Sequence, residues 1–281
     1  MGLLEGKKLR DAIDALALVS PGATGKLTPK QRGTQSIIGS LAYTDRVHIE
    51  NALGTHALSC VMSSPGDDAA IVARSMLYQT YKARKCGVTY GGANFESRPA
   101  TACVMSVNYD MSEGAPSVTE IAADATWADR SRMGIIVTKA GGVVAHSVKL
   151  LKLILASSTE AEAMATARSG EIAVVARAID KGLGCLDPLP MFVATDNRAN
   201  ALIASGQGSA SRMRHAARRY HTFLQRVKSG DVRIGKVDDS ENPSDWLTKW
   251  VGHEKMDRSL EYTKNRRNRV DIDEVLAGAA M

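Results

Sequence analysis

Four acidic residues stand where predicted strands end and predicted helices begin: Asp124, Glu162, Asp196 and Asp245. Asp124 lies near the end of a strand-like run, and Asp196 follows the apolar run at 191–194. Glu162 lies near the start of a long predicted helix, and Asp245 opens a later one. Carboxylate oxygens are the ligands that Mg²⁺ prefers, so acids placed in this way predict one shared metal site.

The segment 157–165 (SSTEAEAMA), which contains Glu162, also has a simpler interpretation as a helix start. Ser158 or Thr159 can cap the helix, and Glu162 lies three residues after Thr159, which is the spacing of a capping box. The helix dipole also favours acidic side chains in the first turn. The segment alone therefore does not distinguish a metal ligand from a well-formed helix start.

Apolar runs place these acids on an α/β framework. Strands are predicted at 118–125, 133–138, 143–148, 191–194 and 232–237, and helices at 159–182, 199–204, 212–228 and from 242 onward. Residues 139–142 (KAGG) predict a hairpin turn between the second and third strands. This order predicts an α/β sandwich with a five-stranded mixed sheet flanked by helices.

The first part of the chain has a different pattern. Residues 1–35 are punctuated by Gly and Pro and predict little regular structure, whereas residues 36–84 carry helical apolar stripes. The segment 112–117 (SEGAPS) predicts a linker, which places a domain boundary near residue 113. A small helical subdomain is therefore expected before the α/β domain.

The composition favours a folded intracellular protein. Of the 281 residues 44% are hydrophobic, which suffices for a packed core, and the net charge of +6 mildly favours a polyanionic partner. The four cysteines are widely spaced, which argues against a zinc knuckle and against a disulfide partner. No apolar run reaches the ~18–20 residues of a membrane span, and no signal peptide is evident. We therefore expect a cytoplasmic or nuclear protein with no membrane partner.

Five ordered motifs resemble the RNase H domain of copia-type retrotransposon polyproteins. Residues 123–128 (ADATWA) resemble that family's S-D-A-D-W-A motif, and residues 155–162 (LASSTEAE) closely match its L-S-S-T-E-A-E motif. Three further motifs are similar at residues 193–199 (VATDNRA), 212–221 (RMRHAARRYH) and 242–249 (NPSDWLTK). The resemblance implies an RNase H-like fold.

The upstream region resembles the segment that joins reverse transcriptase to RNase H in the same polyproteins, at residues 35–43 (QSIIGSLAY) and 61–65 (VMSSP). No Y-x-D-D-type polymerase motif is present, so DNA synthesis is not expected. The resemblance implies that residues 1–112 are a helical, connection-like remnant of reverse transcriptase. Residues 113–270 would then form the RNase H-like domain, and residues 271–281 a C-terminal tail.

The resemblance also implies which acids act. Asp124, Glu162, Asp196 and Asp245 would occupy the family's four carboxylate positions, and Glu162 fits its E-x-x-A register better than Glu160 does. These residues would hold two Mg²⁺ or Mn²⁺ ions, which together promote phosphodiester hydrolysis. Asp124 would bridge the ions, with Asp196 and Glu162 on one of them and Asp245 on the other.

The substrate implied by the resemblance is an RNA–DNA hybrid. The basic helix would contact its phosphates through five residues, Arg212, Arg214, His215, Arg218 and Arg219. A solvated basic surface is the alternative interpretation of the same helix.

Three residues depart from the family's pattern, namely Thr126, Asp129 and His146, and they fit a diverged copy. The leading hypothesis is a metal-dependent endoribonuclease that cleaves RNA in RNA–DNA hybrids. The alternatives are a non-catalytic RNase H-like module that binds nucleic acid, and a fragment of a decayed retroelement.

Overall fold

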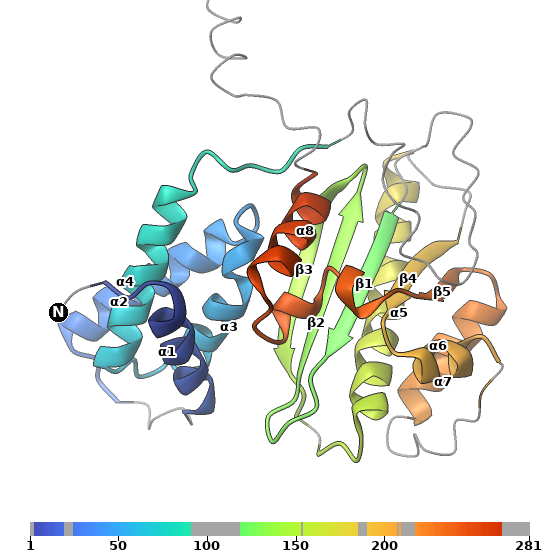
Figure 1. Cartoon of the computed structure of the whole chain (residues 1–281), viewed down its shortest axis with the longest axis horizontal. Helices are drawn as coiled ribbons and strands as arrows, with labels where there is room; N and C mark the ends of the chain where they lie inside the picture. The colour runs from blue at the N-terminus through green and yellow to red at the C-terminus, as the bar shows by residue number, and fades with distance from the viewer. Residues whose placement is uncertain are drawn as a thin grey trace, which may run out of the picture. The chain divides into compact units, whose positions relative to one another are not determined.

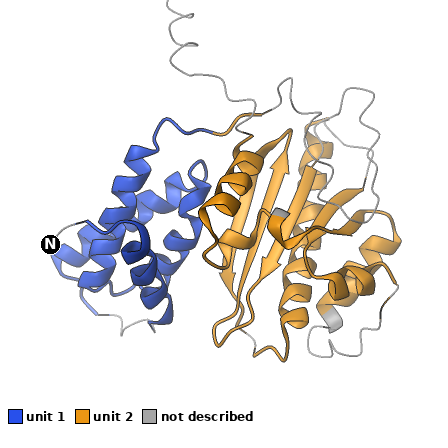
Figure 2. Ribbon diagram, in the orientation of Figure 1, with its two compact units in different colours: residues 1–87 blue, residues 88–281 orange. Residues whose placement is uncertain are grey.

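The computed structural model describes residues 3–19, 25–90, 119–152, 154–184, 190–206, 208 and 217–265. The chain divides into two compact units, residues 1–87 (unit 1) and residues 88–281 (unit 2), which Figure 2 shows in blue and orange. The boundary predicted near residue 113 lies outside the described residues.

Unit 1 is helical and has its own apolar core. Its elements are α1 (Gly6–Leu18), α2 (Pro29–Thr44), the 3₁₀ turn η1 (Ile49–Asn51), α3 (Ala52–Cys60) and α4 (Asp67–Lys82). Ile13 and Leu16 of α1 share one buried cluster with Ile38 of α2, Leu58 of α3 and Met76 of α4. The expected helical subdomain is therefore present.

Residues 1–35 were expected to have little regular structure, and this expectation was wrong. The apolar side chains of α1 form one wall of the core of unit 1, so tertiary packing stabilises a helix that the surrounding Gly and Pro residues obscured. Thr28 caps α2 in a capping box with Gln31, and Pro29 occupies the first helical position, where a missing N–H costs nothing.

Unit 2 is an α/β sandwich built on one sheet (Figure 1). Its strands are β1 (Thr119–Ala125), β2 (Arg132–Lys139), β3 (Gly142–Leu150), β4 (Met191–Thr195) and β5 (Val232–Lys236). Its helices are α5 (Ser158–Gly182), α6 (Arg198–Ala204), α7 (Ala217–Lys228) and α8 (His253–Lys264), with short 3₁₀ turns η5 (Asp239–Glu241) and η6 (Asp245–Leu247).

The strands lie in the order β3-β2-β1-β4-β5. The pairs β1–β2 and β2–β3 are antiparallel, whereas β1–β4 and β4–β5 are parallel. The predicted five-stranded mixed sheet is therefore confirmed. The hairpin turn is also found where it was predicted, because Ala140 and Gly141 connect β2 to β3 with positive φ angles of 48° and 87°.

Strand β1 sends alternate side chains to opposite faces of the sheet, as the pleat requires. Ile121, Ala123 and Ala125 belong to the large apolar cluster that the sheet forms with α5 and α7. Ala122 belongs to a second cluster, on the opposite face, with Phe192, Ala194 and Val237. Asp124 shares the face of Ala122, so its carboxylate leaves the main core and points toward η6.

Helix α7 packs closely against α5 because Gly170 of α5 has no side chain to keep the ring of Phe223 away from its backbone. An added Cβ at Gly170 of α5 would lie 2.5 Å from a ring carbon of Phe223 of α7. The Phe223 side chain is 1% exposed, and Arg226 donates a hydrogen bond of 2.7 Å to the carbonyl oxygen of Gly170. These contacts fix α5, which carries one of the predicted acids.

The segment from residue 242 was expected to begin the last helix, but it forms the 3₁₀ turn η6 and the helix α8 begins only at His253. The Asn242 side chain explains the difference, since it accepts hydrogen bonds from the backbone N–H of Ser244 (3.1 Å) and from its hydroxyl (2.7 Å). It also donates to the carbonyl oxygen of Ala123 in β1, at 3.3 Å. These bonds tie the turn to the sheet instead of allowing a regular helix to start.

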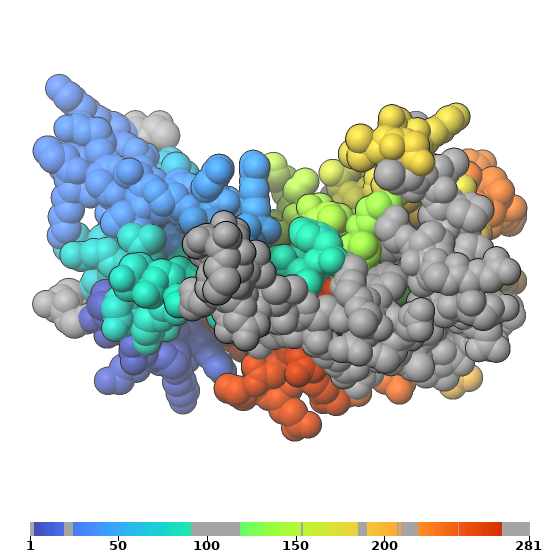
Figure 3. Space-filling model, turned by 90° about the horizontal axis from the view of Figure 1, so that it is seen from above, coloured from blue at the N-terminus to red at the C-terminus, as the bar shows by residue number. Residues whose placement is uncertain are grey.

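Helix α8 lies at the surface of unit 2 and forms an orange-red patch in Figure 3. Among the described helices, none has both the length and the hydropathy that crossing a bilayer would require. Cys60 and Cys86 are not joined by a disulfide within the described residues, and the other two cysteines lie outside these residues.

Candidate metal centre

Asp124 is buried near the end of β1, and its side chain points toward η6. The residue is 1% exposed, and one of its carboxylate oxygens accepts a hydrogen bond from the hydroxyl of Thr248. Across the sheet, Asp124 is register-paired with Gly134 of β2. The hydroxyl is a neutral donor, so Thr248 orients the carboxylate without neutralising its charge.

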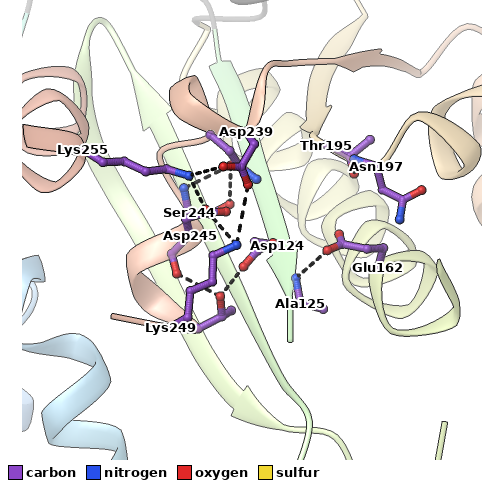
Figure 4. Close-up of polar contacts among 12 residues, drawn as sticks. Asp124, Ala125, Glu162, Thr195, Asn197, Asp239, Ser244, Asp245, Lys249 and Lys255 are labelled. Carbon is purple, nitrogen blue, oxygen red and sulfur yellow. Dashed lines mark hydrogen bonds and ion pairs between the residues drawn. The ribbon is translucent and has the colours of Figure 1, made fainter. Parts of the chain in front are cut away.

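Helix α5 brings Glu162, and not Glu160, to Asp124. The helix is capped by Ser157, whose side chain accepts from the backbone N–H of Glu160, instead of by Ser158 or Thr159 as expected. Because of this start, the Glu160 carboxylate turns back to accept from the backbone N–H of Ala156 at 2.8 Å. Glu162 then projects toward β1, where it accepts from the backbone N–H of Ala125 at 3.3 Å (Figure 4).

Asp196 directly follows β4, and Asp245 is the first residue of η6. Strands β1 and β4 are parallel neighbours, so their carboxyl ends meet at one edge of the sheet and bring Asp196 near Asp124. Asp245 is fully buried, and its carboxylate contacts the ammonium groups of Lys249 (2.9 Å) and Lys255. All four acids predicted from the sequence are thus gathered at this edge of the sheet.

The carboxylates form two groups that share Asp196. Single ligand oxygens of Asp124, Glu162 and Asp196 lie within 4.8 Å of one another, and so do those of Asp196, Asp239 and Asp245. Asp239, in η5, was not predicted. The signal in the sequence was its place just after the strand predicted at 232–237, which is similar to the place of Asp196 just after the apolar run at 191–194.

Mutual repulsion and burial disfavour the charged form of these acids. Burial, together with the negative charge of Asp245, raises the pKa of Asp124 to about 7. Burial and the charges of Asp124 and Asp196 raise the pKa of Glu162 to about 10. Burial and the charge of Asp245 also raise the pKa of Asp196. The cluster therefore requires cations or protons to become neutral.

The donor set fits a hard divalent cation. Every member offers carboxylate oxygen, which suits Mg²⁺ or Mn²⁺. In addition, one oxygen of Glu162 and one of Asp245 are buried without a hydrogen-bond partner. A buried, unsatisfied carboxylate oxygen is costly unless a proton or a ligand completes its contacts, and a cation bound between these residues would do so for both atoms.

No model of a known protein family matches the chain. A stretch of 132 residues, 47% of the chain, is 28% identical to the retrovirus-related Pol polyprotein of the transposon TNT 1-94 from tobacco, Nicotiana tabacum. This chain resembles the RNase H domain of a retrotransposon Pol polyprotein. The match spans only 10% of that polyprotein.

Solved RNase H structures are also similar to the chain. The N-terminal RNase H domain of a Mycobacterium tuberculosis protein is 20% identical, with a TM-score of 0.36, over 52% of this chain and 97% of that one. RNase H1 of Halobacterium salinarum is 17% identical, with a TM-score of 0.36, over 46% of this chain and 93% of that one. LC11-RNase H1, solved with an RNA/DNA hybrid, is 12% identical, with a TM-score of 0.37, over 46% and 93%.

The predicted nucleic-acid contacts of the RNase H-like domain are described only in part. Arg212, Arg214 and His215 lie outside the described residues, and of Arg218 only the backbone, in α7, is described. Arg219 is exposed on α7, where it lines a cavity together with Arg226 and Glu171. The phosphate contacts assigned to this helix therefore remain a prediction.

The absence of a side chain at Gly134 allows η6 to pack closely on β2. An added Cβ there would lie 2.6 Å from the Cβ of Leu247 and 3.0 Å from the Cγ2 of Thr248. We expect Gly134→Ala to displace η6, at a cost of about 1–3 kcal/mol in unfolding free energy. Because Thr248 and Asp245 move with η6, Mn²⁺ binding should weaken as well.

Thermal unfolding and Mn²⁺ titration of the purified variant test this prediction. The control is Gly182→Ala, since an added Cβ at Gly182 would meet no atom within 4 Å. A Gly134→Ala protein with unchanged stability and Mn²⁺ affinity would contradict the role given to Gly134.

Proposed function

We propose that the RNase H-like domain is a divalent-metal-dependent endoribonuclease that hydrolyses the RNA strand of RNA–DNA hybrids. The observation that carries the proposal is the convergence of Asp124, Glu162 and Asp196, of which Glu162 has one buried oxygen without a hydrogen-bond partner. The resemblance to a Pol polyprotein and the RNase H-like strand order support the choice of substrate.

The chain's own residues would divide into two ligand groups for two Mg²⁺ or Mn²⁺ ions. Asp124, Glu162 and Asp196 would hold one ion, and Asp196, Asp239 and Asp245 the other. Asp196 is favoured as the shared ligand, in place of Asp124, because it belongs to both groups. Two bound ions would supply an activated water molecule and neutralise the charge of the phosphodiester.

Surrounding residues would keep these ligands in position. Thr248 donates to Asp124, and the backbone N–H of Ala125 donates to Glu162, so each carboxylate has a fixed orientation. Asn242 holds η6 to β1 through the carbonyl oxygen of Ala123 and thereby positions Asp245.

The hybrid would be held by positive charge on α7 and in the segment before it. We assign this role to Arg212, Arg214, His215, Arg218 and Arg219, since guanidinium groups bind phosphate oxygens in a bidentate manner. Unit 1 and the residues up to 112 would correspond to the connecting segment of a reverse transcriptase.

Cleavage of a labelled RNA–DNA hybrid in Mg²⁺ or Mn²⁺ tests the proposed function. We expect the full chain to cleave the RNA strand and Asp196→Asn to lose at least about 100-fold in rate, because even residues that only orient metal ligands contribute 10–100-fold. The control is Asp231→Asn. Asp231 is exposed and directly precedes β5. Because β4 and β5 are parallel, Asp231 lies at the amino ends of these strands, whereas Asp196 lies at their carboxyl ends.

A folded parent protein that binds the hybrid but does not cleave it would refute the enzymatic proposal. That result would support the alternative of a non-catalytic nucleic-acid-binding module. Equal loss of activity in Asp231→Asn and Asp196→Asn would also count against the metal centre.

A further inference from the structure

Two lysines already contact the second group of carboxylates. The Lys249 ammonium lies 2.9 Å from an Asp245 carboxylate oxygen and 3.7 Å from one of Asp239. The Lys255 ammonium, from α8, contacts the same Asp245 oxygen and lies 3.1 Å from the other oxygen of Asp239. Figure 4 shows both ammonium groups converging on Asp239 and Asp245.

The first group of carboxylates has different surroundings. Asp124 accepts from a hydroxyl and Glu162 from a backbone N–H, both of which are neutral donors. Within the described residues, no lysine, arginine or histidine forms an ion pair with Asp124, Glu162 or Asp196. The two groups share Asp196, and the charge of Lys249 acts on Asp124 and Asp196 as well. They differ in that, among the described residues, only the second group contains carboxylates in direct ion-pair contact with lysines.

Ammonium groups compete with a metal ion for carboxylate oxygens, because both neutralise the same negative charge. The competition is strong at Asp245, whose side chain is fully buried while that of Lys255 is only 15% exposed. In such surroundings an ion pair is weakly screened by water. A divalent ion at the unpartnered oxygen of Asp245 is repelled by both ammonium groups, and it must displace them to reach Asp239 and the other Asp245 oxygen.

We propose that Lys249 and Lys255 act as built-in competitors of the second metal ion, so that the two cation positions fill in a fixed order. The position at Asp124, Glu162 and Asp196 fills first. The position at Asp196, Asp239 and Asp245 fills only when the lysine side chains swing away, which their long flexible stems permit. The inference rests on the proposed metal-dependent function and specifies its regulation by cation concentration.

The test is Mn²⁺ binding to the full chain, followed by electron paramagnetic resonance and by calorimetry, without any substrate. The parent protein should bind one ion tightly and a second at least about tenfold more weakly. In Lys249→Met, Lys255→Met and the double variant the second ion should bind at least about tenfold more tightly, a change in the range by which groups around metal ligands alter affinity. Lys255→Arg keeps the positive charge and should keep the second site weak.

Lys236→Met is the charge-matched control. Lys236 lies 3.4 Å from Asp238, which belongs to neither carboxylate group, so its removal should leave the affinity ratio unchanged. If Lys236→Met tightens the second site as much as the other variants do, a general charge effect replaces the proposed competition. If the lysine variants leave the second site unchanged or weaken it, the lysines stabilise η6 and α8, and the inference is wrong.

Failure of this inference can be distinguished from failure of the proposed function. A parent protein that binds one Mn²⁺ ion, and loses it in Asp124→Asn, retains the proposed metal centre whatever the lysine variants show. A folded parent protein that binds no Mn²⁺ at all overturns both proposals.

Discussion

Replacing Asp124 by Asn is expected to raise the melting temperature of the metal-free protein and to abolish hybrid cleavage. Burial and the nearby charge of Asp245 raise the pKa of Asp124 to about 7, so at neutral and higher pH its negative charge destabilises the fold. Asn removes that charge and can still accept the hydrogen bond from Thr248. We expect a gain on the order of 1–3 kcal/mol, and a loss of cleavage of at least about 100-fold because a metal ligand is removed.

The effect of metal separates this explanation from improved packing. In Mg²⁺ the parent protein should gain stability, since a ligand that binds only the folded state stabilises it, whereas Asp124→Asn should gain little. Asp231→Asn serves as the control, because Asp231 is exposed and its replacement should change neither melting temperature nor cleavage. An Asp124→Asn variant that is less stable than the metal-free parent would refute the assignment of Asp124 to a repulsive carboxylate cluster.

Raising the pH should destabilise the metal-free protein over a range in which ordinary carboxyl groups are already ionised. In the folded protein Asp124 and Glu162 keep their protons up to pH values of about 7 and about 10, and the pKa of Asp196 is raised as well. In the unfolded chain these groups lose their protons near their ordinary values of 3.8 and 4.5. Between these limits the folded state binds more protons than the unfolded state does. The stabilisation that these carboxyl groups provide is therefore fully present below their unfolded pKa values and is lost as the pH rises through their folded pKa values.

Melting temperatures measured from pH 5 to pH 9 in a chelator, and again in Mg²⁺, test this prediction. The metal-free protein should lose stability across the range, and Glu162→Gln should have a shallower dependence because one of the shifted groups is absent. Mg²⁺ should stabilise the protein most at high pH, where its ligands are ionised without competition from protons. A pH dependence that is identical in the parent and in Glu162→Gln would show that Glu162 is not one of the shifted groups.

The sequence alone predicted the order of the elements of unit 2 from β1 to β5, and it identified four acids that the structure brings to one end of the sheet. Apolar runs and turn residues mark the strands, and the hairpin at Ala140 and Gly141 follows from local backbone preferences. Asp124 and Asp196 follow apolar stretches, so their places at strand ends are also local properties. Parallel strands β1 and β4 then bring their carboxyl ends to one edge of the sheet, as expected for α/β proteins.

The motif register already favoured Glu162 over Glu160, but the physical reason for this choice lies in the tertiary structure. Residues two apart on a helix point in directions that differ by about 200°, so only one of them faces β1. Which one does so depends on where α5 begins and how it packs on the sheet. The three consecutive hydroxyl residues at 157–159 leave that start ambiguous, and the structure uses Ser157.

The contacts of the lysines with Asp239 and Asp245 depend entirely on how separate segments of the chain pack together. Asp239, Asp245 and Lys255 come from η5, η6 and α8, and each has a local role in the sequence that gives no sign of the others. They meet because the Asn242 side chain replaces the start of a helix by a turn anchored to β1, and because Gly134 lets that turn approach β2. Local patterns can identify side chains that are capable of binding metal. Only the packing of these segments decides that lysines contact Asp239 and Asp245 but form no ion pair with Asp124 or Glu162 among the described residues.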